Sequence, residues 1–471
     1  MHGGGRERAG PIQPPSVSAT PQPTSARDLA AEVLLEEDKK RAYVRDLLSE
    51  ARSKLADPRD RALLTELTYG VVRRRSTLDA VLQPRSRRPL EKLARPVRVA
   101  LRLALYQVLF LDRVPVHAAV NHAVSWARGR TNTKTSGFVN AVLRASARNV
   151  EGLARGAEMP RRDVPRDDGS AMRIKEDVFA DPDVDLAAAL AGRYSMPRWL
   201  VARWLESAGE RSTLARLRTG IGRPPLGLRA RGERGDLYRA LQEAGLTVRP
   251  GPVDTALLVE GGPESVALEH VARGDAWVQD ATAQQVAPLV DPQPDERVLD
   301  LCAAPGGKAL HLADLMQRGT IVACDVAAEK LTRLEALVDL VPDGVTLDVQ
   351  QVPREGPLPL EAGSFDRILV DAPCTNTGVL RRRVEVRWRL DPEDIQALAK
   401  LQRDLLDRAL VLLKPGGRLV YTTCSLESEE NEETIASFLA AHPEVVREKS
   451  TEVPGGRDQD GGFAAVMRRG S

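Results

Sequence analysis

The sequence predicts a multidomain protein with an all-α N-terminal part, a small α/β domain in the middle and a C-terminal α/β domain built on a parallel sheet. At 471 residues the chain is longer than the roughly 100 to 200 residues of a usual domain. Apolar residues have a helical spacing up to residue 150, and strand and helix patterns alternate from about residue 190 onward. Charge is distributed in the same way. Residues 27–150 hold 25 Lys and Arg against 13 Asp and Glu, whereas the net charge of the whole chain is only +2, so the rest of the chain is acidic.

Residues 1–25 are rich in Pro, Ser, Gly and Gln, so we expect a disordered leader. This segment has no apolar core of a signal peptide, and the sequence has no run of about 18 apolar residues that could span a bilayer. The four cysteines form no C-x-x-C pair, which argues against a disulfide framework and a zinc site. We therefore expect a cytoplasmic protein with reduced thiols, no membrane association and no bound metal.

Residues 26–150 are predicted to form a helical bundle. Asp57 is a candidate N-cap, and Pro58 suits the first turn of the helix that follows. One segment, 96–111, is apolar nearly all round and is therefore predicted to be the buried central helix. The predicted helices of this part are 58–75, 96–111, 114–129 and 136–149.

The excess of positive charge in the helical part suggests a polyanionic partner. Lys and Arg gain affinity for nucleic acids by displacing counterions from phosphates. A solvated helical surface is the alternative explanation of the same charge.

Residues 151–189 carry many Pro, Gly and charged residues, which is typical of a linker or loose extension. Residues 190–283 mix helix and strand patterns and fit a small α/β domain. Its helices are predicted at 194–209 and 235–245, and its strands at 224–231, 254–261 and 275–280.

Residues 284–471 alternate strand and helix patterns, which implies a parallel sheet with helices on both faces. Ligands of such sheets bind at the carboxyl ends of the strands. Strands are predicted at 297–303, 320–326, 344–352, 366–373 and 417–425, and helices at 306–317, 329–341 and 391–413.

The first of these strands leads into LCAAPGGK at residues 301–308. Small residues and paired glycines at a strand-to-helix turn let a nucleotide-like cofactor approach the backbone. The turn lacks the G-x-G-x-x-G spacing, and Lys308 is followed by Ala, so it is not a Walker loop. Asp325 follows about 20 residues later, where an acid can accept hydrogen bonds from ribose hydroxyls. An ordinary glycine-rich turn and a helix-capping acid are the structural alternatives.

Two more strands end at cysteines. DAPC places Cys374 after the fourth strand, and TTCS places Cys424 after the fifth. Because parallel strands bring their carboxyl ends to one edge, both thiols are expected near the glycine-rich turn. Cys302 and Cys324 have apolar neighbours inside strand ends, so we interpret their side chains as small core residues.

These motifs together resemble the RNA (cytosine-5) methyltransferases, specifically the bacterial small-subunit ribosomal RNA enzymes of the RsmB (Sun/Fmu) type. The N-terminal helices look like the NusB-type RNA-binding domain that is fused to those enzymes, and the resemblance covers most of residues 27–466. It rests on the segments 301–308, 323–325, 365–374, 377–382, 413–425 and 429–431 in the catalytic part.

The resemblance implies S-adenosylmethionine as cofactor and small-subunit ribosomal RNA as partner. It implies that Asp371 contacts the cofactor or the target base, that Cys424 is the nucleophile, and that Cys374 helps to expel the enzyme from the product. A thiolate suits this role, because carbon 5 of cytosine accepts a methyl group only after a nucleophile has added to carbon 6. The implied cofactor-binding residues are Cys302, Ala303, Ala304, Pro305, Gly306, Gly307, Lys308 and Asp325.

The sequence departs from the family pattern at three places. A Gly-Asp pair that contacts the adenine side of the cofactor is missing after the third strand, where Asp348, Gln350 and Gln351 are the nearby polar residues. The small pair after DAPC is replaced by Thr375-Asn376, and Val384-Glu385 stands in place of Pro-Asp. Both thiols remain, so we expect an active enzyme.

A basic cluster follows the DAPC loop, and we interpret it as a phosphate clamp beside the active site, with a solvated loop as the alternative. The runs 73–75 and 85–88 are weaker candidates, because helix-end positions explain them too. The cluster consists of Arg381, Arg382, Arg383, Arg387 and Arg389.

Other functions remain open at this point. DNA cytosine methylation is the nearest rival, but DNA enzymes have a Pro-Cys-Gln loop where this chain has Cys374 followed by Thr375. Transfer RNA is another possible substrate. A non-catalytic RNA-binding factor with a vestigial sheet domain belongs to a different class, and the two thiols and the CAAPGGK turn argue against it.

Overall fold

The computed structural model describes residues 25–40, 42–154, 160–262 and 264–471. The leader expected at residues 1–25 therefore lies outside the described residues, apart from Ser25. The chain divides into two compact units, one made of Met1–Val71 with Leu82–Arg148 and the other of Val72–Val81 with Asn149–Ser471. Among the described residues, no helix has both the length and the apolar character needed to cross a bilayer.

The first unit is helical, as predicted. Its central helix α5 (Arg95–Phe110) is buried on nearly every side and packs against α1 (Ala26–Lys40), α6 (Val116–Arg128) and α7 (Thr133–Arg148). Asp57 accepts a 2.7 Å hydrogen bond from the amide of Arg59, which confirms it as a cap of α3. The remaining helices are α2 (Val44–Ser53), α3 (Pro58–Arg73), whose end enters the second unit, and the 3₁₀ turns η1 (Gln83–Arg85) and η2 (Leu90–Lys92).

The segment that we expected to be a linker contains a small sheet with the strand order β1-β3-β2. The buried carboxylate of Asp163 accepts two hydrogen bonds of 2.8 Å from Arg173, and Val164 and Ile174 are fully buried. These contacts give the segment a core that its Pro, Gly and charge content did not indicate. Its strands are β1 (Val150–Ala154), β2 (Asp163–Pro165) and β3 (Ala171–Ile174).

An antiparallel sheet with the order β5-β6-β4-β7 forms the middle of the second unit, and it includes the three strands predicted there. Strand β5 was not predicted. The long helix α9 (Arg198–Ile221) is kinked at Gly209, where φ is 74°. The other elements are β4 (Leu226–Ala230), β5 (Thr247–Pro250), β6 (Ala256–Gly261), β7 (Ala276–Val278), α4 (Arg75–Leu82), α8 (Leu186–Tyr194), α10 (Arg234–Glu243) and α11 (Glu264–Ala272).

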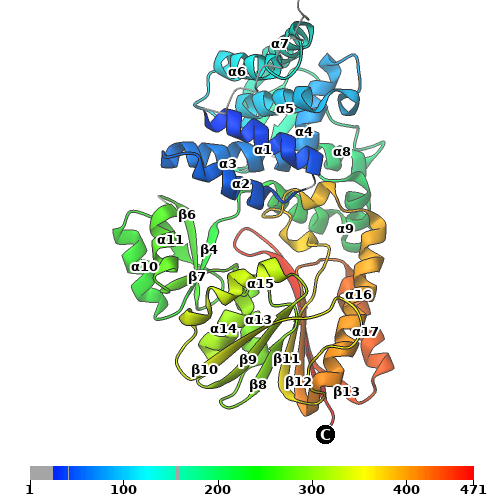
Figure 1. Cartoon of the computed structure of the whole chain (residues 1–471). Coiled ribbons are helices and arrows are strands. Elements are labelled where there is room, and N and C mark those ends of the chain that lie inside the picture. The colour runs from blue at the N-terminus through cyan, green and yellow to red at the C-terminus, as the bar shows by residue number, and fades with distance from the viewer. Residues whose placement is uncertain (1–24, 41, 155–159, 263) are drawn as a thin grey trace, which may run out of the picture. The chain divides into compact units, whose positions relative to one another are not determined.

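A seven-stranded sheet forms the C-terminal part, with the order β10-β9-β8-β11-β12-β14-β13. Figure 1 labels all of these strands except β14. The five predicted strands are parallel, and the two unpredicted ones, β13 and β14, are antiparallel. Edge strand β13 is mostly exposed and charged, so its sequence carries little apolar signal. The strands are β8 (Arg297–Asp300), β9 (Gly319–Asp325), β10 (Val345–Gln351), β11 (Phe365–Asp371), β12 (Leu413–Thr423), β13 (Val445–Pro454) and β14 (Gly461–Arg469).

Helices cover both faces of this sheet, as expected for a parallel arrangement. One face packs against α16 (Pro392–Leu412) and α17 (Glu432–Ala441), and the other against α13 (Val286–Val290), α14 (Gly307–Leu315) and α15 (Ala328–Glu335). From β8 the chain adds β9 and β10 on one side of the sheet, and it then returns to add β11 and β12 on the other side of β8, so the switch point lies between β8 and β11. The carboxyl ends at such a switch point form the usual ligand crevice.

Candidate active site

The glycine-rich turn follows β8 and leads into α14. Gly306 has a φ of 107°, and a side chain there would meet Leu334 Cδ1 at 2.3 Å, so the position requires glycine. At Gly307, among the described residues and apart from its chain neighbours and the backbone of its own helix, an added Cβ would meet no atom within 4 Å. The backbone at the start of α14 is therefore open to a ligand.

Asp325 stands at the end of the neighbouring strand β9. One carboxylate oxygen accepts a 3.2 Å hydrogen bond from the amide of Ala304, and the other accepts one of 3.0 Å from the amide of Ala327. The carboxylate thus ties the glycine-rich turn to the start of α15, so the capping interpretation applies. Each oxygen keeps a second lone pair for a ligand hydroxyl.

Lys308 and Asp371 form an ion pair of 2.5 Å between the glycine-rich turn and the end of β11. Burial alone lowers the pKa of Lys308, but the carboxylate of Asp371 outweighs it, and the net shift is upward. The ammonium of Lys308 is therefore fixed in its charged form, beside the segment that carries Cys374.

Asp300 is a site residue that the sequence analysis missed. It is the last residue of β8 and is fully buried, and neither carboxylate oxygen has a hydrogen-bond partner among the described residues. Burial, with a smaller contribution from Asp371, raises the pKa of Asp300 to about 8. The available signal was an acid inside the apolar strand RVLDLCA, directly before the turn.

The residues around the turn fit S-adenosylmethionine. This cofactor carries a sulfonium and an ammonium group, and the unpartnered oxygens of Asp300 offer acceptors next to the turn. Val326, which directly follows Asp325, is 41% exposed and offers an apolar surface to a base. In the third-strand region, the Gln351 amide donates to the Val326 carbonyl at 3.2 Å, whereas Gln350 is turned to Asp348.

The two predicted catalytic thiols lie together. Cys374 Sγ and Cys424 Sγ are 3.1 Å apart, and the thiol of Cys424 donates to Asn376 Oδ1 at 3.2 Å. Asn376 has a left-handed backbone with φ 62° and donates to the Cys374 carbonyl at 2.6 Å. Asn376, one of the two residues of the Thr375-Asn376 departure, therefore hydrogen-bonds to both cysteines. Cys302 is half-buried and Cys324 is buried among apolar side chains, which agrees with their interpretation as core residues.

The thiols differ in their electrostatic surroundings. The hydrogen bond from Cys374 lowers the pKa of Cys424, and the charges of Arg383 and Lys308 lower it further. The same hydrogen bond and burial raise the pKa of Cys374. Cys424 is therefore the thiol that ionises first, as a nucleophile requires.

Cys374→Ala is expected to move the pH midpoint of Cys424 alkylation upward, because the Cys424 thiolate loses its strongest hydrogen bond. Iodoacetamide labelling across pH, read by mass spectrometry of the Cys424 peptide, measures this. Cys324→Ala, which changes a core thiol outside the pair, is the control. An unchanged midpoint in Cys374→Ala would contradict the electrostatic assignment.

Glu430 holds the two thiol loops together. Its buried carboxylate accepts hydrogen bonds from the Thr375 amide at 2.9 Å, from the Thr375 and Ser425 hydroxyls, and from Gln402 Nε2 at 3.0 Å. Thr375 follows Cys374 and Ser425 follows Cys424, so a single carboxylate fixes both segments. The sequence analysis quoted Glu430 within a motif but gave it no role.

Glu430→Ala is expected to lower the free energy of unfolding by about 3 kcal/mol, because four buried donor groups lose their acceptor. Urea denaturation measures the loss. Glu432→Ala removes an exposed carboxylate that pairs with Arg447, and it should change stability by less than about 0.5 kcal/mol. Equal stability of the two variants would show that Glu430 does not hold the loops.

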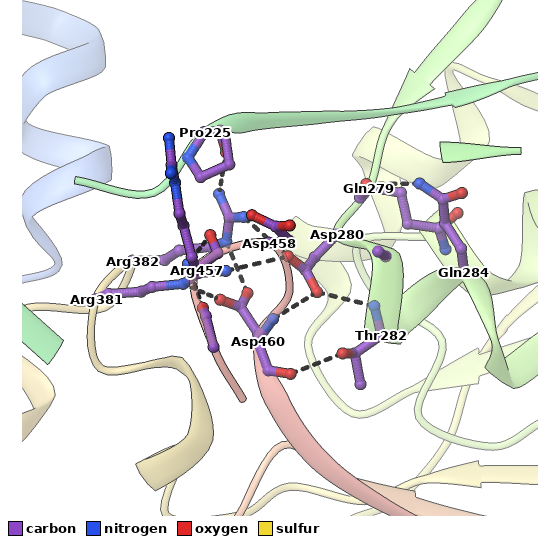
Figure 2. Close-up of polar contacts among 12 residues, drawn as sticks. Pro225, Gln279, Asp280, Thr282, Gln284, Arg381, Arg382, Arg457, Asp458 and Asp460 are labelled. Atoms are coloured by element: carbon purple, nitrogen blue, oxygen red, sulfur yellow. Dashed lines mark hydrogen bonds and ion pairs between the residues drawn. The ribbon is translucent and has the colours of Figure 1, made fainter. Parts of the chain in front are cut away.

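The interpretation of the basic cluster as a phosphate clamp is wrong for three of its five members. Arg381 and Arg382 donate to the buried carboxylate of Asp460, and Arg382 also donates to Asp280 (Figure 2). Arg387 is fully buried and donates to the carbonyls of Ser195, Gly220 and Leu380. These guanidinium groups neutralise buried acids and satisfy carbonyls, so they are not available to phosphate.

Arg383 is the exposed member of the cluster near the thiols, and it donates to Asn376 Oδ1 at 2.7 Å. The weaker candidates divide as well. Arg73 and Arg74 are buried and donate to the carbonyls of Arg381 and Pro165, whereas Arg87 and Arg88 are exposed. Val384 and Glu385, the third departure from the family pattern, are both buried.

Comparison with known proteins gives two family matches. Residues 287–469 match the family model of the 16S rRNA methyltransferase RsmB/F, and residues 24–148 match that of the NusB family. The chain is 33% identical to the probable ribosomal RNA small subunit methyltransferase B of Bacillus subtilis, over 91% of each chain. It is 34% identical to the ribosomal RNA small subunit methyltransferase B of Klebsiella pneumoniae, over 94% of this chain and 97% of that one. The crystal structure of PH0851 is similar with a TM-score of 0.75 and 26% identity, over 95% of this chain and 99% of that one. The chain therefore belongs to the RsmB/F family of S-adenosylmethionine-dependent ribosomal RNA methyltransferases.

Proposed function

We propose that this protein methylates carbon 5 of a cytosine in small-subunit ribosomal RNA through a covalent cysteine–RNA intermediate. The observation that carries the proposal is the pair of thiols 3.1 Å apart at the edge of the sheet where the glycine-rich turn also lies. A methyltransferase that acts on a nitrogen or oxygen atom needs no catalytic thiol, because such an atom attacks the methyl group directly.

The proposed reaction has three steps, and the two thiols act in different ones. The Cys424 thiolate adds to carbon 6, and the electron pair of the 5,6 double bond becomes available at carbon 5. S-adenosylmethionine, when bound at the turn, would supply the methyl group and leave as S-adenosylhomocysteine. A base then takes the proton from carbon 5, the electron pair restores the double bond and the Cys424 thiolate is expelled, a step in which we assign Cys374 to assist. Methylated RNA and free enzyme result.

The turn and its partners would hold the cofactor. The backbone of 302–308 would contact it, and Asp325, which ties this turn to α15, would accept hydrogen bonds from its ribose. Asp371, which holds Lys308, would contact the cofactor or the target base. The fixed positive charge of Lys308 also favours the thiolate of Cys424.

Bisulfite sequencing of RNA from a strain that lacks the gene tests the proposed function. We expect a cytosine of the small-subunit ribosomal RNA to lose its methyl group, and a plasmid copy of the gene to restore it. Loss of a methyl group from a transfer RNA instead would identify transfer RNA as the substrate. If every site stayed methylated, the non-catalytic RNA-binding alternative would replace the proposal.

The exposed Arg87 and Arg88 are expected to contact RNA phosphates, because the first unit is the basic part of the chain. Replacing both with Glu should weaken RNA binding uniformly across sequences and reduce the salt dependence of binding, while cofactor affinity stays unchanged. Filter binding at several salt concentrations measures this. Lys449→Glu, an exposed charge change on β13, is the control, and an unaltered salt slope in the Arg87/Arg88 variant would contradict the assignment.

A further inference from the structure

Asp460 is a buried acid in the turn between β13 and β14, with 5% of its surface exposed. Its two oxygens accept from different arginines: Arg381 Nε lies 2.6 Å from Oδ1, and Arg382 Nε lies 2.7 Å from Oδ2 (Figure 2). Both arginines belong to the segment that follows Cys374. The carboxylate therefore ties the end of the sheet to the loop of one catalytic thiol.

The backbone of Asp460 is fixed as well. Its amide donates to Asp280 Oδ1 at 3.0 Å, and its carbonyl accepts from the Thr282 hydroxyl at 2.7 Å. Asp280 also accepts from Arg382 Nη2 at 2.9 Å. Asp280, Asp460, Arg381 and Arg382 thus form a cluster of two acids and two arginines, which we call the Asp460 cluster.

The two residues after Asp460 lie close to the backbone around Cys424. A Cβ added at Gly461 would lie 3.1 Å from Gly378 Cα, and one added at Gly462 would lie 2.8 Å from Thr423 O and 3.8 Å from Cys424 Cα. The amide of Gly378 in turn donates a hydrogen bond to the Cys424 carbonyl at 2.9 Å. The peptide of Cys424 therefore lies against backbone that the Asp460 cluster holds in place.

We propose that Asp460 is a positioning residue for Cys424. It contacts neither thiol, and it acts through Gly461, Gly462 and Gly378, which set where the Cys424 backbone lies. The inference rests on the proposed function, in which Cys424 attacks the base. Its consequence is that the rate of attack depends on a charge in the β13–β14 turn.

Asp460→Asn preserves the shape of the side chain but removes its charge and one of its acceptors. Two neighbouring guanidinium groups are then left with Asp280 as the remaining acid of the cluster, and the turn is expected to shift. A misplacement of the nucleophile by about 1 Å can cost about 100-fold in rate, because attack needs a closely defined approach. Cofactor binding uses other residues and should not change.

The experiment measures the rate at which a covalent RNA adduct forms in a Cys374→Ala background, with S-adenosylmethionine and RNA at saturation. Calorimetric titration with S-adenosylmethionine counts the competent sites, so that loss of folded protein does not enter the rate. We expect Asp460→Asn to form the adduct at least about tenfold more slowly, with cofactor affinity within about twofold of the parent. Asp458→Asn is the matched control: it alters an acid of the same turn that pairs with Arg249 instead, and its rate should equal that of the parent.

Arg382 provides a second pair of variants. Arg382→Gln is expected to slow attack in the same direction, and Arg382→Lys, which keeps a charged donor, is expected to recover part of the rate. An adduct rate per site equal to the parent in Asp460→Asn would overturn the inference, and so would an equal slowing in Asp458→Asn. If the Cys374→Ala parent formed no adduct at all, the proposed function would fail first, so the two failures are distinguishable.

Discussion

Replacing Cys424 with alanine is expected to lower the rate of methyl transfer by more than about 1000-fold, because the reaction then has no nucleophile to activate carbon 5. S-adenosylmethionine and RNA should still bind with the affinity of the parent protein, since the side chain is small and Glu430 still holds both loops. Transfer of a radiolabelled methyl group to ribosomal RNA measures the rate, and calorimetry measures the binding of the cofactor.

Cys324→Ala is the matched control for this prediction. Cys324 is a thiol of the same sheet, buried in the core at β9, and it is not one of the two predicted catalytic thiols. This variant should retain activity within a few fold. Near-normal turnover of Cys424→Ala would mean that the thiol pair only fills space at the strand ends, and it would remove the covalent mechanism.

Asp325→Ala is expected to weaken S-adenosylmethionine binding by about 100-fold. The ribose would lose its acceptor, and the amides of Ala304 and Ala327 would lose the carboxylate that ties the glycine-rich turn to α15. Glu329→Ala removes an exposed acid from the first turn of the same helix, so it controls for charge alone. Calorimetry that found equal affinities for the two variants would refute the assignment of Asp325.

The parallel sheet and its glycine-rich turn could be predicted because their signals are local. Each parallel strand is a short apolar run that ends at a turn, and a ligand turn needs small residues in sequence. The positions of Asp325, Cys374 and Cys424 followed from the ends of the predicted strands. Strand β13 lacked such a signal, since it is an exposed edge strand in which four of the ten residues are charged.

The partners of buried charges could not be predicted, because they are distant in sequence. Arg382 pairs with Asp460, 78 residues later in the chain, and with Asp280, 102 residues earlier. Because neither acid is near it in sequence, the run of basic residues suggested a phosphate site. The role of Glu430 was missed for the same reason, because its contacts arise only when loops from different parts of the chain meet. Asp300 did have a local signal, but its complete burial follows from the packing of the whole sheet.

The most direct test of the covalent mechanism is a denaturing gel of Cys374→Ala incubated with labelled RNA and S-adenosylmethionine. If Cys424 attacks and Cys374 assists release, this variant should methylate, release slowly and accumulate a protein–RNA adduct that maps to Cys424 and is absent from the Cys374→Ala/Cys424→Ala double variant. An adduct from Cys424→Ala but not from Cys374→Ala would reverse the two roles. If neither variant formed an adduct and both turned over normally, the result would contradict the account.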